Sequence, residues 1–219
     1  PTVGAFSDKL ISMGGSTILT EVPEMFGAEE LLMNRCETEY LFNQTVALVN
    51  DFKNYFKSHN QTIYENPSPG NKKGGISSLE DKSLGCTQKS GSAPVMGVLS
   101  YGEPIKEKGL NLLSAPGNDL VASTALAASG AHIVLFTTGR GTPFASPVPT
   151  VKISTNNQLA KKKQNWIDFN CGVMVNDTPL DELSENLLDF VLEIASGKKS
   201  KSEEAGFHDM AIFKQGVTL

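Results

Sequence analysis

One stretch, residues 110–136, constrains the fold most strongly, because two apolar runs there flank a helical segment. Residues 110–115 predict a buried strand, and Asn118 or Asp119 in the following turn can cap a helix over 120–129. Gly130 suits the end of that helix, and residues 131–136 predict a second strand. Such a βαβ unit has parallel strands and a right-handed crossover. The sequence therefore predicts an α/β fold with three layers and a mainly parallel, Rossmann-like sheet.

Other elements fit this class. The spacing of Phe42, Val46, Val49, Phe52 and Phe56 predicts an amphipathic helix over 38–57. Further strands are expected at 17–20, 151–155 and 166–169, with helices at 28–35 and 180–195, the last capped by residues 178 and 179. We expect residues 198–206 to be a charged linker before a C-terminal strand at 211–213.

The stretch 66–91 is polar and rich in glycine, yet its chemical groups are placed individually. We interpret it as a long Gly-rich loop that walls an active site, with a short helix near 79–84. An extended chain would put Cys86 and Gln88 on one face, whereas a helix would pair Cys86 with Lys89. Cys86 can bind a metal as thiolate, Lys89 can act as a base or bind a carboxylate, and we expect Gln88 to contact the substrate. The alternative is a buried thiol beside a surface lysine.

Two carboxylates, Glu21 and Glu24, leave the first predicted strand on either side of Val22 and Pro23. Carboxylates on a fixed loop suit a hard divalent cation, and either one can serve as a general base. The alternative is that they cap or pair with the helix that follows. The two interpretations weigh about equally, with Glu21 ahead because it leaves the strand directly.

A second candidate loop follows the strand at 131–136, where ligands bind in open parallel sheets. Arg140 lies between two glycines, and its planar guanidinium matches a carboxylate. We expect substrate contacts from neighbouring hydroxyl and amide side chains, namely Thr137, Thr138 and Thr142, with Asn156 as a weaker candidate. The alternative is a surface arginine in a turn.

The composition excludes several function classes. The net charge of −5 and the absence of a basic cluster with aromatic residues argue against nucleic acid, and no apolar run reaches the ~20 residues of a membrane span. Three widely spaced cysteines make no disulfide framework and fit a reducing cytoplasm. Because the chain begins at Pro1 and not Met, we expect it to be an excised fragment.

Long motifs along the chain resemble the altronate/galactarate dehydratase family, which is also similar to the large subunit of sulfolactate sulfo-lyase. They include GGSTILTEVPEMFGAEELLMNRC, LNLLSAPGNDLVASTALAASGAHIVLFTTGRGTPF, NWIDFNCG and AIFKQGVTL. The resemblance covers essentially all of residues 1–219 and implies the C-terminal domain of a sugar-acid dehydratase. It implies partners in the missing N-terminal and middle domains and leaves a homo-oligomer open.

The resemblance further implies a cytoplasmic hydro-lyase of hexuronate breakdown that converts D-altronate to 2-keto-3-deoxy-D-gluconate. Its implied cofactor is a divalent metal, Fe²⁺ or Mn²⁺, and we expect Glu21 and Cys86 to contribute ligands. The chemistry favours Glu21 or Glu24 as base, and Lys89 with Arg140 on the substrate carboxylate. The alternatives are a galactarate dehydratase, a sulfolactate sulfo-lyase-like subunit, or an inactive structural fragment when isolated.

Overall fold

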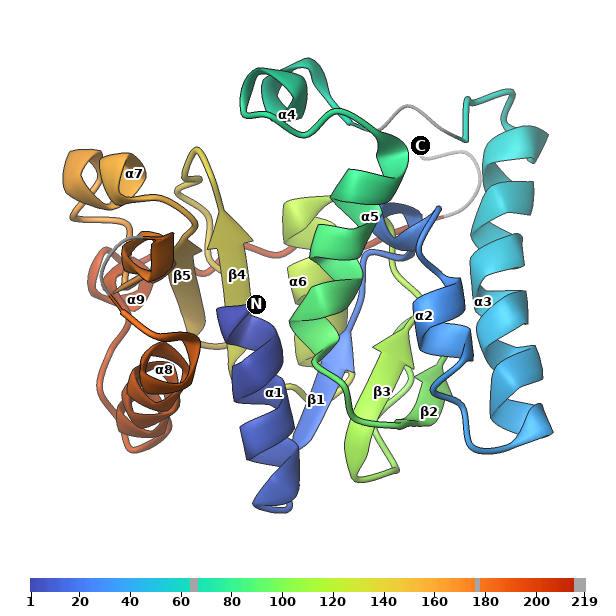
Figure 1. Ribbon diagram of the computed structural model, residues 1–219, viewed down its shortest axis with the longest axis horizontal. Helices are drawn as coiled ribbons and strands as arrows, with labels where there is room; N and C mark the ends of the chain where they lie inside the picture. The colour runs from blue at the N-terminus through green and yellow to red at the C-terminus, as the bar shows by residue number, and fades with distance from the viewer. Residues whose placement is uncertain (64–66, 176–177, 215–219) are drawn as a thin grey trace.

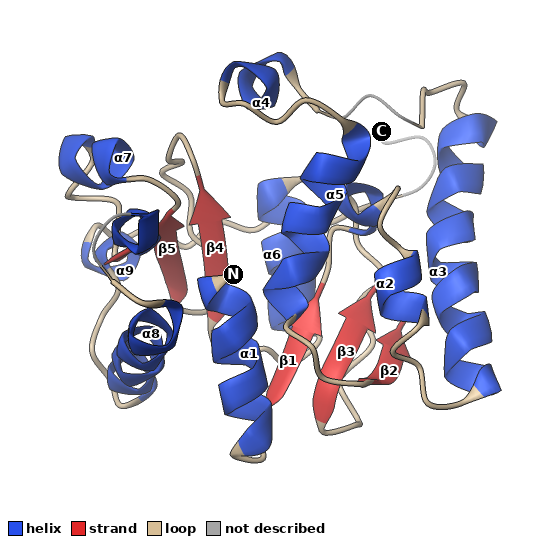
Figure 2. Ribbon diagram, viewed as in Figure 1, coloured by secondary structure: helices blue, strands red, loops and turns tan. Residues whose placement is uncertain are grey.

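The computed structural model describes residues 1–63, 67–175 and 178–214. Asn66, the first residue of the predicted loop, and the last five residues of the closing motif lie outside this range. Two parallel sheets lie side by side, with helices on both faces (Figures 1 and 2). The prediction of an α/β fold with parallel strands is confirmed.

The first sheet has the order β1-β3-β2, formed by Ser16–Leu19, Gly109–Leu113 and Val95–Leu99. All pairings are parallel, and Ser16 lies opposite Gly109. The second sheet has the order β4-β5-β6, formed by Val134–Thr138, Thr150–Ser154 and Phe169–Asn170. Every residue of β3 and β5 is buried, as expected for parallel strands covered on both faces.

The predicted βαβ unit needs a correction. β3, α6 (Asp119–Ala128) and β4 follow one another as expected, and the Asn118 side chain accepts a hydrogen bond from the Val121 amide to cap α6. However, β3 and β4 belong to different sheets. The sheets are separated by a break, and the edge strand of the first sheet beside this break is β1. The crossover therefore links the two sheets instead of neighbouring strands.

The helices cover the sheets according to their apolar faces. The helix α3 (Glu39–Ser58) packs Leu48, Val49 and Phe52 into the core of the first sheet. It also contacts α2 (Glu30–Met33) and the 3₁₀ turn η1 (Val22–Met25). The helices α1 (Thr2–Ser12) and α8 (Leu180–Ala195) pack against one another, and α8 buries Leu187 and Leu188 in the core of the second sheet. Smaller elements are α7 (Asn157–Lys162) and the 3₁₀ turn η3 (Cys171–Val175).

Two segments differ from the sequence-based expectation. The described part of 66–91 is mostly helical, with α4 (Pro69–Lys73), α5 (Leu79–Thr87) and the 3₁₀ turn η2 (Gln88–Ser90) in place of a long loop. The expected linker at 198–206 contains α9 (Lys201–Glu204), which begins with a capping box. Residues 211–213 form no strand, and Phe213 instead packs its ring among Phe52, Tyr55 and Tyr101.

Candidate active site

The candidate site is built around the turn that follows β1. Glu21 follows the strand with φ 65° and ψ 57°, in the left-handed region that non-glycine residues seldom adopt. The next amide, of Val22, donates to the Ala115 carbonyl at 3.1 Å, which ties this turn to the end of β3. Val22 then starts η1, with Pro23 in its first turn. Strained backbone of this kind persists where the surrounding structure holds it, and it is concentrated at functional sites.

The helix α5 and the η2 turn that follows it bring three polar side chains close to this turn. Lys82 Nζ forms an ion pair with Glu24 Oε2 at 3.0 Å, and the Cys86 thiol donates to the same oxygen with an Sγ–O distance of 3.8 Å. Lys89 follows one turn later in η2. The structure thus brings together Glu21, Glu24, Cys86 and Lys89, in the helical arrangement that pairs the thiol with the lysine.

Burial and charge set the protonation of this cluster. Desolvation raises the pKa of Glu21 from 4.5 to about 7, although the charge of Lys89 acts in the opposite direction. Burial also raises the pKa of the Cys86 thiol and of the Asp119 carboxyl. Burial acts to lower the pKa of Lys82, but the nearby charge and hydrogen bond of Glu24 outweigh this effect, so that the pKa of Lys82 is raised. The cluster therefore contains both a charged lysine, Lys82, and a carboxyl group, Glu21, that titrates near neutrality.

Lys82 and Asp119 belong to this cluster, although the sequence did not single them out as site residues. Lys82 lies four residues before Cys86, so helical spacing on α5 places both on one face. That periodicity was readable, but the composition of 66–91 favoured a loop. Asp119 was predicted only as a cap of α6, and its proximity to Glu24 depends on the pairing of β1 with β3.

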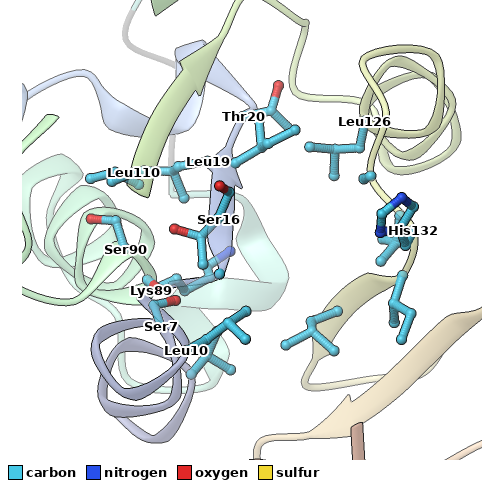
Figure 3. A pocket seen from close by; sticks show the side chains of 18 of the residues that line it. Ser7, Leu10, Ser16, Leu19, Thr20, Lys89, Ser90, Leu110, Leu126 and His132 are labelled. Atoms are coloured by element: carbon cyan, nitrogen blue, oxygen red, sulfur yellow. Dashed lines mark hydrogen bonds between the residues drawn. The ribbon is translucent and has the colours of Figure 1, made fainter. Parts of the chain in front are cut away.

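A cavity of about 640 Å³ opens beside the cluster, between β1 and β4 (Figure 3). Glu21, Lys89, Asp119 and Thr137 line it where the strands end. Lys89 is fixed through its backbone, because its carbonyl accepts a hydrogen bond from Ser7 of α1 at 3.0 Å. The helix α1 also approaches η2 so closely at Gly4 that a Cβ there would clash with a backbone carbonyl of η2. Close backbone packing thus positions Lys89 at the mouth of the cavity.

The loop after β4 carries the predicted anion-binding residues. Thr138 Oγ1 accepts hydrogen bonds from the amides of Arg140 at 3.3 Å and Gly141 at 2.9 Å, so this hydroxyl organises the loop. The Arg140 side chain is exposed and lies directly against Gly70 of α4. Lys152 is fully buried, and its Nζ donates to the carbonyls of Thr142, at 2.9 Å, and of Phe144. Burial lowers the pKa of Lys152.

Two predicted substrate contacts lie elsewhere or serve the fold. Asn156 caps α7 by accepting from the Leu159 amide at 2.8 Å, and its side-chain nitrogen donates to the Gly139 carbonyl at 3.2 Å. Gln88 is exposed and does not line the cavity. Neither position excludes contact with a substrate, but neither joins the cluster around Glu21.

Within residues 1–63, 67–175 and 178–214, no group of three or more His, Cys, Asp or Glu side chains is placed to hold a metal ion. Cys86 and Asp119 each lie near Glu24, but Glu24 already forms an ion pair with Lys82. The described residues therefore do not fit a complete Fe²⁺ or Mn²⁺ site.

A family model described as D-galactarate/altronate dehydratase, C-terminal, matches residues 1–218. The chain belongs to this family. Over its full length it is 59% identical to the altronate dehydratase of Escherichia coli and 60% identical to that of Bacillus subtilis. It is 36% identical over 217 residues to the galactarate dehydratase (L-threo-forming) of E. coli. The prediction of the family is confirmed.

This chain spans 44% of the length of each of the two altronate dehydratases and 42% of the length of the galactarate dehydratase. These proteins thus contain more than twice the polypeptide seen here. In the described part of the chain, no helix combines the length and the apolar character that a membrane span requires.

Proposed function

We propose that this chain is the C-terminal catalytic-region domain of a hydro-lyase that dehydrates D-altronate to 2-keto-3-deoxy-D-gluconate. The observation that carries this proposal is the identity of 59% and 60%, across the whole chain, to two altronate dehydratases. The identity of 36% to a galactarate dehydratase makes galactarate the less favoured substrate. A sugar-acid panel, with altronate and galactarate offered to the full-length enzyme, tests the choice. Faster turnover of galactarate would overturn it.

The proposed reaction removes the proton from C2 and expels the C3 hydroxyl as water. The resulting enol then tautomerises to the 2-keto-3-deoxy acid. A general base works best when its pKa is near the working pH, and Glu21 meets this requirement with a pKa of about 7. Its position at the end of β1, where the cavity opens, allows it to face a substrate. Glu24 is the second carboxylate, and its ion pair with Lys82 suits it less to proton abstraction.

The proton at C2 is weakly acidic, so positive charge must stabilise the enediolate that forms on the substrate carboxylate. Lys89 lines the cavity together with Glu21, and we assign it to this carboxylate. We assign Arg140, on the loop after β4 and outside the residues that line the cavity, as a second cation, and Thr137, which lines the cavity, to the sugar hydroxyls. The implied Fe²⁺ or Mn²⁺ stays a prediction, and donors beyond the described residues would have to complete its ligands.

Substitutions in the full-length enzyme test these roles. We expect Lys89→Ala and Arg140→Ala each to lower kcat/KM for altronate by at least about tenfold, which corresponds to about 1.4 kcal/mol of transition-state stabilisation. Lys161→Ala, at an exposed lysine of α7, is the matched control and should leave turnover unchanged. Near-normal turnover in both the Lys89 and the Arg140 variants would remove the proposed carboxylate clamp.

The isolated chain is expected to be inactive, because it spans 44% of the relatives' length and its described residues hold no three-ligand metal group. Purified chain mixed with altronate and either Fe²⁺ or Mn²⁺ should form no 2-keto-3-deoxygluconate. Product formation at rates near those of the full-length enzyme would show that the chain alone is sufficient.

A further inference from the structure

The two sheets face one another through edges that lack a strand partner among the described residues. β1 pairs only with β3, and β4 pairs only with β5. The labelled strands of both sheets point the same way, and β1 lies next to β4 across the break (Figure 1). Backbone amides and carbonyls on both edges thus face the cavity of about 640 Å³. Unpaired backbone groups inside a protein are costly, so such edges are normally paired or covered.

Burial shows that the break lies in the middle of the architecture. Every position of β3 and β5 is buried, whereas every position of β1 and four positions of β4 are only partly buried. Central strands of a parallel sheet are normally the most buried, because helices cover both faces. Thr17 Oγ1, on β1, is also buried without a hydrogen-bond partner among the described residues. The surroundings of β1 and β4 are therefore incomplete.

The walls of the cavity suit a strand better than a sugar acid. Figure 3 shows Leu10 and Leu19 on one side of the space and Leu126 on the other. The lining is predominantly apolar and comes from α1, α6 and α8 as well as from the two strands. Charged side chains lie at the two ends of the cleft, with Glu21, Lys89 and Asp119 where β1 ends and Lys106, Glu107 and Lys108 before β3 begins. A polyhydroxy acid would leave its hydroxyls unpaired along the apolar walls, whereas a strand would pair both open edges and bury apolar side chains.

The direction of α1 indicates which segment fits. Figure 1 shows α1 in front of the break and α6 behind it. The Pro1 amino group is close enough to Lys89 for their charges to interact, so α1 begins where β1 ends and runs antiparallel to it. A strand in the break, followed by α1 and β1, would make a right-handed crossover, which is the rule for parallel strands. The link from β3 through α6 to β4 would then pass behind the added strand.

We propose that a strand from the polypeptide preceding Pro1 in the full-length protein fills this cleft, parallel to β1 and β4. The relatives contain ample chain for it, since this chain spans 44% of their length. The result would be one continuous seven-stranded sheet of order β2-β3-β1-X-β4-β5-β6, where X is the added strand. Its carboxyl end would emerge beside Glu21 and Lys89, so that upstream residues complete the candidate site.

Thiol accessibility in the full-length protein tests this proposal. Ser16→Cys places a thiol on β1 in the cleft, at a position that is only partly buried, and Leu126→Cys places one on the facing wall of α6. Met13→Cys, at a side chain that is 66% exposed just beyond α1, is the matched control. We expect the cleft thiols to react with a maleimide at least about a hundredfold more slowly than the control in folded enzyme. Reaction of both cleft thiols at the control rate would overturn the proposal.

Hydrogen exchange followed by mass spectrometry on the unmodified full-length protein avoids any effect of substitution on folding. We expect peptides covering β1 and β4 to be as protected as those covering β3 and β5, and to stay so at concentrations where the protein is monomeric. Exchange in β1 and β4 that is faster than in β3 and β5 would overturn the proposal. Protection that disappears on dilution to monomers would instead assign the cleft to a second copy and would overturn it equally.

Discussion

Replacing Glu21 by glutamine should remove a large part of the pH dependence of this chain's stability. Burial raises the pKa of Glu21 from 4.5 to about 7, so the folded protein binds the proton more tightly than the unfolded chain. The stabilisation is fully present below pH 4.5 and is lost as the pH rises through about 7. The pKa difference corresponds to about 3 kcal/mol in the free energy of unfolding.

Glutamine resembles the neutral carboxyl and retains the same left-handed backbone, so the strain at this position should cancel in the comparison. We expect Glu21→Gln to match the parent chain at pH 4.5 and to exceed its stability by about 2–3 kcal/mol at pH 8.5. Urea unfolding followed by the fluorescence of Trp166, the single tryptophan, measures both values. The same comparison at intermediate pH should show the gap opening between pH 4.5 and about 7.

Glu24→Gln serves as the control for this experiment, because it neutralises a carboxylate of the same cluster but breaks the ion pair with Lys82. It is expected to destabilise the chain at pH 8.5. A stability gap for Glu21→Gln that is equal at both pH values would refute the reasoning, since it would mean that ionisation of Glu21 carries no folding cost.

Three further predictions concern stability and are measured by urea unfolding. Lys82→Met should cost about 1–2 kcal/mol, because it removes the ion pair of 3.0 Å with the partly buried Glu24, whereas Lys106→Met in an exposed pair should have no measurable effect. Asn118→Ala should cost about 1 kcal/mol through loss of the α6 cap, and Asn118→Asp should recover most of it. Gly4→Ala should cost about 2–3 kcal/mol, because its Cβ would clash with η2; an unchanged stability would show that α1 can shift freely.

Local signals in the sequence were sufficient for most elements. The helix α8 has the bounds that its periodicity predicts, and Thr38 and Asn118 cap α3 and α6. Partition of the strands into two sheets was not predictable, because strand pairing depends on contacts between distant segments and no local residue encodes it. The glycines and lysines of 66–91 favoured a loop, yet Ser68 and Ser78 cap α4 and α5 there.

Some of the wrong predictions could have been avoided, because the sequence contains a local pattern that indicates the observed structure. Ser200 and Glu203 form a capping box three residues apart, which indicates a helix where we expected a charged linker. For the site, position after a strand pointed to Glu21 and Glu24, and the flanking glycines of 66–91 pointed to Lys89; their catalytic roles stay predictions. Asn156 looked equally suitable by type, but hydroxyl and amide side chains often cap helices and organise turns, and the sequence alone does not separate the two uses.

The loop that carries Arg140 has a consequence for the thermodynamics of anion binding. Two amides of the loop are held by the Thr138 hydroxyl, and the carbonyls of Thr142 and Phe144 are held by buried Lys152. The conformational entropy of this backbone is therefore lost on folding and not on binding. An arriving carboxylate would have to order only the Arg140 side chain, at up to about 2 kcal/mol, whereas each freely moving backbone residue would add about 1–2 kcal/mol. A substitution of Lys152 that removes its hydrogen bonds to these carbonyls should consequently raise KM without any change in the groups that touch the substrate.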